Sequence, residues 1–356
     1  MEKKQIVFLY TELASYVLAC VAKLIETNEV DVHIVRYPIN EEAPFQFKFS
    51  DKINIYERAD YNDSQLLELV NSINPSVIIC SGWIDKGYLK VCKAFKNKSI
   101  TVLALDNHWR GDIKQRIASW LSPFYLKSRF SNCWVPGKLQ QEYAKKLGFK
   151  NDLILTGFYS CDFDLFNGQY FSNKKAKEIL FPKRFIYVGR YYEFKGINDL
   201  WKAFIELQNE SPNEWELWCL GSGDIAPVIH PKVKHFGFVQ PADLPSYIKN
   251  TGVFVLPSHF EPWGVVVHEY AAAGFPIVCS SEVGAGGTFV ENGYNGYIYN
   301  SGDVNQLKVA LKKIMKLSDN ELNGMSERSV EKGKQITVDG WVEKLMSLLK
   351  IKIDTI

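Results

Sequence analysis

Short apolar runs of strand length alternate with helical patterns along the chain. In the first half the runs cover residues 5–10, 31–37, 53–56, 76–82, 100–106, 133–136 and 153–157. Residues 77–80 and 100–105 are continuous apolar runs rich in β-branched side chains, which is typical of strands buried on both faces. Helical patterns fall between them at 12–27, 64–73 and 86–96. This alternation predicts an open parallel α/β sheet.

The pattern lapses into polar residues at 166–182 and then restarts. The later strand candidates cover residues 184–190, 215–221, 235–239, 253–257, 277–280 and 296–299, with helices at 198–209, 244–250 and 265–273. A chain of 356 residues exceeds one comfortable core. We therefore predict two Rossmann-like domains, 1–168 and 169–336, with ligands beyond the carboxyl ends of the strands. Helical patterns follow at 304–317 and 338–349, and segment 337–356 is expected to pack back toward the first domain.

The composition limits the kinds of partner and cellular location that we expect for the protein. The chain has 42 basic and 40 acidic residues and is 46% hydrophobic, which favours a soluble globular protein without a nucleic-acid partner. Seven scattered cysteines with no CxxC pair predict reduced, buried thiols in a cytoplasmic protein. Met1 is followed almost at once by a strand pattern, so no secretory signal is expected. The apolar segments are too short to span a bilayer, so any membrane contact is expected to be peripheral.

The second domain begins with a candidate anion site. One strand ends at Gly189, and Arg190 and Lys195 follow in a short loop before a helix. Arginine can donate a fork of hydrogen bonds to phosphate oxygens, whereas lysine acts as a compact charge. A helix N-terminus already favours a diphosphate, so the pair is a candidate diphosphate site; a surface Arg and Lys beside a turn is the alternative.

Two glutamates mark a second candidate. Glu261 follows the apolar run 253–257, and Glu269 comes eight residues later, about two helical turns on and on roughly the same face. Gly264 lies between them and can expose backbone N–H groups at the start of the helix. The unit offers acceptors for sugar hydroxyls and donors for an anion, as a nucleotide-sugar requires. The alternative is an ordinary strand–helix unit with two solvated glutamates.

Two more turns carry weaker signals. Gly221 and Gly223 match a dinucleotide fingerprint on paper, but Pro227 follows at once and no helix can open there. These glycines are expected to let the backbone approach a nucleotide or another loop. Phe238 lies in a short turn that could place backbone groups against a base, although a plain strand–turn–helix is as good an interpretation.

Six segments in order resemble glycosyltransferase family 4, whose members are retaining GT-B enzymes that use nucleotide-diphospho-sugars. They are Gly-Arg-x4-Lys-Gly (189–196), Leu-Gly-x-Gly (220–223), Gly-Phe-Val (237–239), Pro-Ser-x-x-Glu-Pro-x-Gly (257–264), Glu-x7-Glu (261–269) and Glu-Asn-Gly-x-Asn-Gly (291–296). The resemblance covers nearly all of the second domain, about half of the chain. It implies a GT-B fold, in which two Rossmann-like domains face each other across a cleft.

The resemblance also assigns roles. Arg190 and Lys195 would hold the diphosphate, and Glu269 would accept hydrogen bonds from the ribose hydroxyls. Glu261, with the backbone amides of Trp263, Gly264 and Val265, would hold the donor sugar. Gly189, Gly221, Gly223 and Phe238 would complete the donor site.

The first domain matches the family less well. The loop after its first strand, residues 10–16, lacks the family's glycines. His108 resembles the family's strand-end histidine, which contacts the donor sugar; a structural histidine is about equally expected. Asp162 and Asp164 form a DxD, the metal motif of another glycosyltransferase fold, but they resemble the family's linker segment. Neither a metal nor another cofactor is expected.

A basic and aromatic stretch, 109–134, is a candidate membrane contact. Residues 109–150 carry nine Lys or Arg and two Asp or Glu, and five of these cations alternate with aromatic residues between 109 and 134. Such a pattern suits shallow docking on an anionic leaflet. The alternative is a solvated helix that covers the sheet and buries its aromatic side chains.

The family resemblance implies a retaining glycosyltransferase of the hexosyltransferase type. The donor would be a UDP- or GDP-sugar, and the acceptor a hydroxyl of a glycan or lipid-linked intermediate of surface polysaccharide biosynthesis. The expected location is the cytoplasm, or the inner face of the membrane. A GT-B nucleotide-sugar epimerase and a catalytically inactive nucleotide-sugar-binding module are the alternatives. The base, the sugar, the acceptor and the oligomeric state are not fixed by the sequence.

Overall fold

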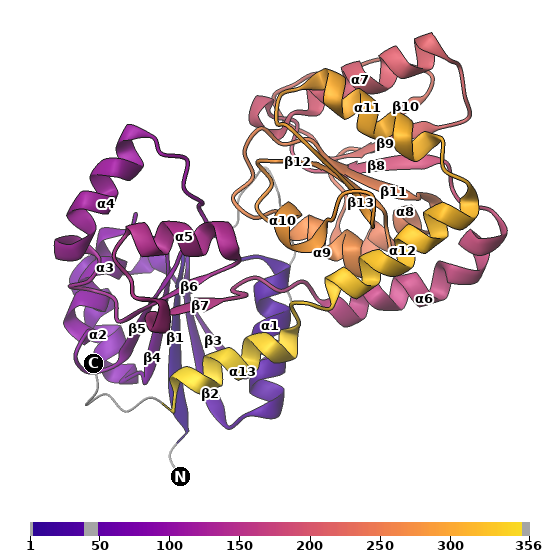
Figure 1. Ribbon diagram of the computed structural model, residues 1–356. Helices are drawn as coiled ribbons and strands as arrows, with labels where there is room; N and C mark the ends of the chain where they lie inside the picture. Colours follow the sequence, from indigo (N-terminus) through magenta and orange to yellow (C-terminus); the bar gives the residue numbers. More distant parts are fainter. Residues whose placement is uncertain (1–2, 39–48, 351–356) are drawn as a thin grey trace. The chain divides into compact units, whose positions relative to one another are not determined.

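The chain divides into two compact units, one of residues 1–160 with 336–356 and one of residues 161–335 (Figure 1). The structure, a computed structural model, describes residues 3–38 and 49–350. Residues 351–356 of the predicted terminal segment 337–356 lie outside that description, as do residues 1–2 and 39–48. The boundary predicted after residue 168 falls inside helix α6 (Phe163–Ile179).

The first unit contains a parallel seven-stranded sheet. Its strands are β1 (Lys4–Tyr10), β2 (Val30–Arg36), β3 (Ile53–Glu57), β4 (Val77–Ser81), β5 (Ile100–Ala104), β6 (Asn132–Val135) and β7 (Ile154–Thr156). They lie in the order β3-β2-β1-β4-β5-β6-β7. The helices are α1 (Ser15–Thr27), α2 (Asp63–Ile73), α3 (Lys86–Phe95), α4 (Ile113–Tyr125), α5 (Lys138–Lys146) and α13 (Val338–Leu348).

Alternate residues of each strand enter two different cores. Ile6 and Phe8 of β1 pack with α1 and α13, whereas Val7 and Leu9 pack with α2, α3 and α5. This division follows from the two-residue period of a strand, which places neighbours on opposite faces. Trp341 of α13 stacks on Trp134 with ring centroids 5.1 Å apart, so the end of the chain completes the first of these cores.

The second unit contains a parallel six-stranded sheet. Its strands are β8 (Arg184–Val188), β9 (Glu216–Leu220), β10 (Val233–His235), β11 (Val253–Leu256), β12 (Ile277–Ser280) and β13 (Gly296–Tyr299), in the order β10-β9-β8-β11-β12-β13. The helices are α6, α7 (Ile197–Glu210), α8 (Leu244–Asn250), α9 (Val265–Ala272), α10 (Gly286–Phe289), α11 (Val304–Met315) and α12 (Asp319–Gly333). Two parallel α/β units confirm the predicted fold class.

Three elements differ from the prediction. The strand expected at 235–239 ends at His235, because Gly237 has a left-handed φ of 68° that a strand cannot continue through. The polar stretch 166–182 is mostly helix α6, whose N-terminus is capped by the Asp162 carboxylate. Helix α12 was not predicted, although Ser318 and Glu321 form a capping box at its start.

The predicted state of the cysteines is confirmed, since all seven are free and buried. Among the residues that the structure describes, no helix is long and apolar enough to cross a membrane.

Candidate donor site

The predicted donor residues gather where the strand order of the second sheet reverses. From β8 the chain proceeds outward to β9 and β10, and β11 then returns to the other side of β8. In open parallel sheets such a reversal leaves a crevice beyond the carboxyl ends of the two central strands. The loop after β8 carries Arg190 and Lys195, and the loop after β11 carries Glu261.

The loop after β8 is held by backbone contacts. Residues Glu193–Lys195 form a short 3-10 turn, and Gly196 ends it with φ 66°. A Cβ at Gly196 would lie 2.2 Å from the carbonyl oxygen of Pro257, so only glycine allows this approach to the end of β11. The carbonyl of Phe194 accepts from the His259 N–H at 2.8 Å. The two loops are therefore packed together by their backbones.

This packing brings the two main candidates into contact. The Nζ of Lys195 lies 2.5 Å from Oε2 of Glu261, and both side chains are 14% exposed. Arg190, half-buried, lies with its guanidinium 5.4 Å from the ring centroid of Tyr192. Lys195 and Glu261 thus meet at the strand reversal, and Arg190 lies in the same loop as Lys195.

A rigid turn carries Glu261. Its N–H donates to the carbonyl of Glu282 at 3.0 Å, and its own carbonyl accepts from Gly284 at 3.0 Å. Trp263 is buried, and its carbonyl accepts from Ala285 at 2.8 Å. These bonds join the loop after β11 to the loop after β12 and so hold Glu261 in a fixed position at the carboxyl end of the sheet.

The start of α9 presents unpaired donors. Gly264 caps the helix with φ 86°. Within the described residues, the N–H groups of Trp263, Gly264 and Val265 donate to no backbone or side-chain oxygen of the protein. The first N–H groups of a helix lack intrahelical partners and favour anions or polar oxygens. These are the three amides that the family resemblance assigns to the donor sugar.

Glycines bring a third loop to the same edge. A Cβ at Gly221 would lie 1.9 Å from the Gly189 carbonyl oxygen, and one at Gly223 would lie 2.5 Å from that of Tyr191. The N–H of Tyr191 donates to Ser222 at 2.9 Å. No helix follows, so the expectation that these glycines serve loop approach agrees with the structure.

Glu269 is placed differently from the prediction. Helix α9 begins at Val265, so Glu261 precedes it and the two glutamates do not share a helical face. The left-handed Gly264 turns the chain between them. Burial raises the pKa of the half-buried Glu269 to about 7, and the charge of Asp162 adds to the rise. A hydroxyl-rich ligand that donates to the carboxylate would favour its charged form.

One pair was missed in the sequence. Nε2 of His259 lies 2.7 Å from Oδ2 of Asp199, which is in the first turn of α7. This contact joins the loop after β11 to the helix that follows Lys195. The signal was an acid three residues beyond Gly196, but its partner lies 60 residues away in the sequence.

The last two predicted residues lie in different units. Phe238 is half-buried and follows Gly237, whose carbonyl accepts from the Gly221 N–H at 2.7 Å, so it adjoins the third loop. His108 follows β5 and belongs to the first unit, where it is buried and its carbonyl accepts from the Gln115 side chain at 2.8 Å. All the other predicted site residues belong to the second unit.

The first aspartate of the DxD, Asp162, has a structural role, because its carboxylate caps the N-terminus of α6. Over residues 3–38 and 49–350, no three His, Cys, Asp or Glu side chains are grouped so that they could hold a metal ion. That the chain uses no metal stays a prediction.

The chain resembles known proteins in sequence, mainly within the second unit. Residues 182–317 match the family model described as glycosyl transferases group 1. A glycogen synthase of Mycobacterium tuberculosis is 32% identical over 143 residues, which cover 38% of this chain and 34% of that enzyme. The capsular polysaccharide biosynthesis glycosyltransferase CapM of Staphylococcus aureus is 30% identical over 191 residues, or 50% of this chain and 49% of CapM. The chain thus aligns with half or less of these relatives' length.

Solved structures show the same fold along nearly the whole chain. A sucrose-phosphate synthase of Thermosynechococcus elongatus has a TM-score of 0.71 at 16% identity, covering 98% of each chain. The Anabaena protein HepE, solved in complex with UDP, has a TM-score of 0.72 at 14% identity and covers 97% of this chain and 99% of its own. The chain therefore has the GT-B fold, and its residues 182–317 are similar in sequence to the group 1 glycosyl transferases.

Proposed function

We propose that the protein is a retaining glycosyltransferase that moves a sugar from a nucleotide-diphospho-sugar to a hydroxyl acceptor. The observation that carries the proposal is the contact between Lys195 and Glu261 at the strand reversal, beside three unpaired amides. A diphosphate needs cations, and a sugar needs carboxylate and amide partners; both sets lie on the loops after β8 and β11. The group 1 match over residues 182–317 supports the same reaction class.

Each residue has a task in this reaction. Arg190 and Lys195 offset the charge that develops on the leaving diphosphate, and preorganised charges of this kind contribute much of an enzyme's rate acceleration. Glu261 and the amides of Trp263, Gly264 and Val265 hold the sugar beside the anomeric carbon. Glu269 accepts hydrogen bonds from the ribose. No residue here is proposed as a covalent nucleophile, so the acceptor attacks on the face of the leaving group and its proton passes to the departing phosphate.

The donor we favour is a UDP- or GDP-sugar, since HepE was solved with UDP on the same fold. CapM is named for capsular polysaccharide biosynthesis, and this supports a glycan or lipid-linked acceptor of a surface polysaccharide. With a lipid-linked acceptor the enzyme would work at the cytoplasmic face of a membrane.

A ligand screen tests the proposal. Thermal shift with UDP-, GDP- and ADP-sugars should reveal one base that raises the melting temperature, and Lys195→Ala should remove that shift. Mass spectrometry of a reaction with the selected donor should then show a glycosylated acceptor. Free nucleotide and an altered sugar without an acceptor would instead indicate an epimerase, and binding without any product an inactive module. No shift with any nucleotide-sugar would contradict the donor site itself.

A further inference from the structure

Helix α4 exposes its large apolar side chains to solvent. A surface helix normally turns its apolar stripe toward the core. In α4 the positions facing the first unit are small or polar, and the buried Ser122 donates to the Leu147 carbonyl at 2.6 Å. Trp120 is 75% exposed and Phe124 82% exposed. The interpretation that this helix buries its aromatic residues is therefore wrong.

The exposed apolar residues form one continuous stripe. At about 3.6 residues per turn, their spacing places them on a single face of α4. This apolar stripe consists of Ile113, Ile117, Trp120, Leu121, Phe124 and Tyr125, all exposed. A contiguous apolar face of this kind marks an interaction surface.

The charges of residues 113–129 have one sign, and the carboxylate that directly precedes them, that of Asp112, caps the N-terminus of α4. Residues 113–129 contain four cations and no carboxylate: Lys114, Arg116, Lys127 and Arg129. None of the four forms an ion pair with a carboxylate in the described part of the chain, and Arg116 donates instead to the Gly111 carbonyl at 2.8 Å. By helical spacing, Arg116 lies beside one edge of the stripe and Lys114 lies at the other edge, between Leu121 and Tyr125, where their chains can extend toward headgroups.

We propose that α4 docks the first unit on an anionic lipid bilayer. The helix lies in the plane of the interface, with Trp120 and Phe124 inserted among the acyl chains. The flanking cations contact lipid phosphates. Interfacial helices combine these two features, a large apolar face and basic residues beside it.

A second copy of the chain is the other occupant of such a face. A symmetric pairing through the stripe would bring both sets of uncompensated cations together across the axis, and like charges there oppose association. An anionic surface turns the same charges into attraction, so the charge pattern favours the bilayer.

Vesicle flotation with the full chain tests the docking. Vesicles of equimolar phosphatidylglycerol and phosphatidylcholine should carry the protein, and Trp120→Glu with Phe124→Glu should lower the bound fraction about tenfold or more. The matched control is Leu165→Glu with Phe171→Glu, which makes the same charge change on exposed apolar residues of α6 and should bind like the wild type. Equal loss in both doubles, or no binding at low salt, would overturn the proposal.

The charge requirement has its own control. Lys114→Gln with Arg116→Gln should weaken binding to the anionic vesicles, whereas Lys202→Gln with Lys249→Gln, on exposed residues of the second unit, should not. Binding should also fall with added salt and be weak on pure phosphatidylcholine. Binding that ignores lipid charge, salt and Lys114 would contradict the assigned role of the cations.

Insertion can be observed directly because all seven native cysteines are buried. Phe124→Cys offers one accessible thiol for an environment-sensitive fluorophore, and its emission should shift to the blue on anionic vesicles. Phe171→Cys, labelled in the same way, should not shift. A blue shift without vesicles that grows with protein concentration, together with dimerisation, would instead identify a second copy as the occupant. None of these measurements requires a sugar donor, so their outcome does not depend on the transfer reaction.

Discussion

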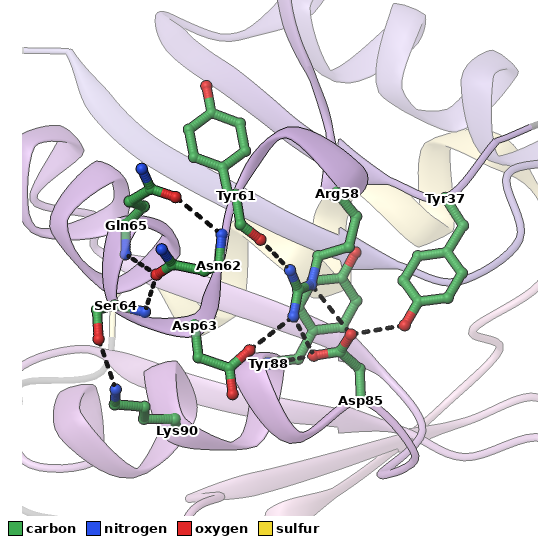
Figure 2. A network of polar contacts seen from close by, with 10 residues as sticks. All are labelled: Tyr37, Arg58, Tyr61, Asn62, Asp63, Ser64, Gln65, Asp85, Tyr88 and Lys90. Atoms are coloured by element: carbon green, nitrogen blue, oxygen red, sulfur yellow. Dashed lines mark hydrogen bonds and ion pairs between the residues drawn. The ribbon is translucent and has the colours of Figure 1, made fainter.

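The carboxyl edges of the two sheets are both rich in charged residues, but they use them in opposite ways. In the second unit, three backbone amides at the strand reversal donate to no oxygen within the described residues, and Lys195 pairs with the Glu261 carboxylate. In the first unit, Arg58, just after β3, is fully engaged (Figure 2). Its Nε donates to Asp85 at 3.0 Å, Nη2 donates to Asp63 at 2.8 Å, and Nη1 donates to the Tyr61 carbonyl.

The partner of Arg58 is equally engaged. The Asp85 carboxylate also accepts from the Tyr37 hydroxyl at 2.6 Å and from the Tyr88 N–H at 2.7 Å. Burial would raise the pKa of Asp85, but these hydrogen bonds and the Arg58 charge outweigh it and hold the pKa below its ordinary value. Tyr88 in turn donates to the carbonyls of Tyr10 and Val35 at the ends of β1 and β2.

The difference separates structural from functional charge. An arginine at a strand end binds an external anion only if its donors are not already used by the protein. Arg58 joins its own loop to the loop after β4, whereas the amides at the start of α9 have no acceptor in the described part of the protein. Both sets of donors lie just beyond strand ends, so their hydrogen bonds and not their positions distinguish them.

Arg58→Ala should have the largest effect, and it should fall on stability. The substitution leaves the Asp85 carboxylate buried without its cation, which costs about 3–5 kcal/mol of the free energy of unfolding. Urea denaturation measures it. The control is Lys90→Ala, whose exposed contact with Ser64 at 3.3 Å should contribute within about 0.5 kcal/mol. An equal free energy of unfolding for the two variants would contradict a structural role for Arg58.

Lys195→Ala should act on transfer. Loss of one preorganised charge at a leaving group lowers kcat by about 100- to 1000-fold. Lys202→Ala, an exposed lysine of the neighbouring α7, is the control and should retain activity. Circular dichroism of both variants checks the fold. A well-folded Lys195→Ala enzyme with wild-type kcat would contradict the proposed role of Lys195 in transfer.

Donor binding should weaken below neutral pH. With the pKa of Glu269 near 7, about one molecule in eleven is ionised at pH 6 and about ten in eleven at pH 8. If the ribose requires the carboxylate, the apparent Kd rises about tenfold from pH 8 to pH 6. Calorimetric titration measures this, and Glu269→Gln should bind weakly with no such slope.

The same carboxyl gives a readout without donor. Its folded-state pKa lies above the ordinary value of 4.5, so the folded state holds the proton more tightly than the unfolded state. Stability should therefore be fullest below about pH 4.5 from this group and decline as pH rises through about 7. Glu269→Gln should lose this pH dependence of the free energy of unfolding. If the dependence is unchanged in the variant, it comes from another group.

His259→Ala should give the smallest effect. Its hydrogen bond to Asp199 positions the loop that carries Lys195, and one such bond contributes about 1 kcal/mol, or roughly fivefold in donor KM. His259→Asn, which can still donate to Asp199, should recover part of the loss. A kcat collapse without a KM change would mean that His259 touches the reacting atoms.

Local sequence patterns predicted much of this architecture. Apolar runs marked twelve of the strands closely, and Arg190, Lys195, Glu261 and Gly264 were each recognisable within one loop. The contact between Lys195 and Glu261 was not, because it spans 66 residues and depends on β8 and β11 being neighbours. Helix α12 was missed because its polar composition hides the stripe of buried residues, Leu322, Met325 and Val330. For α4 the sequence showed an amphipathic helix but not which face was buried.

Helix α13 has a consequence for the order in which the protein is made. The first unit needs Trp341, whose indole N–H donates to the Phe158 carbonyl at 2.8 Å and whose ring stacks on Trp134. The second unit, residues 161–335, is continuous. On the ribosome, the unit that is translated first is thus the last that can close its core, and the second unit can fold before it. A chain truncated before residue 338 should therefore leave the second unit folded and the first one open to proteolysis.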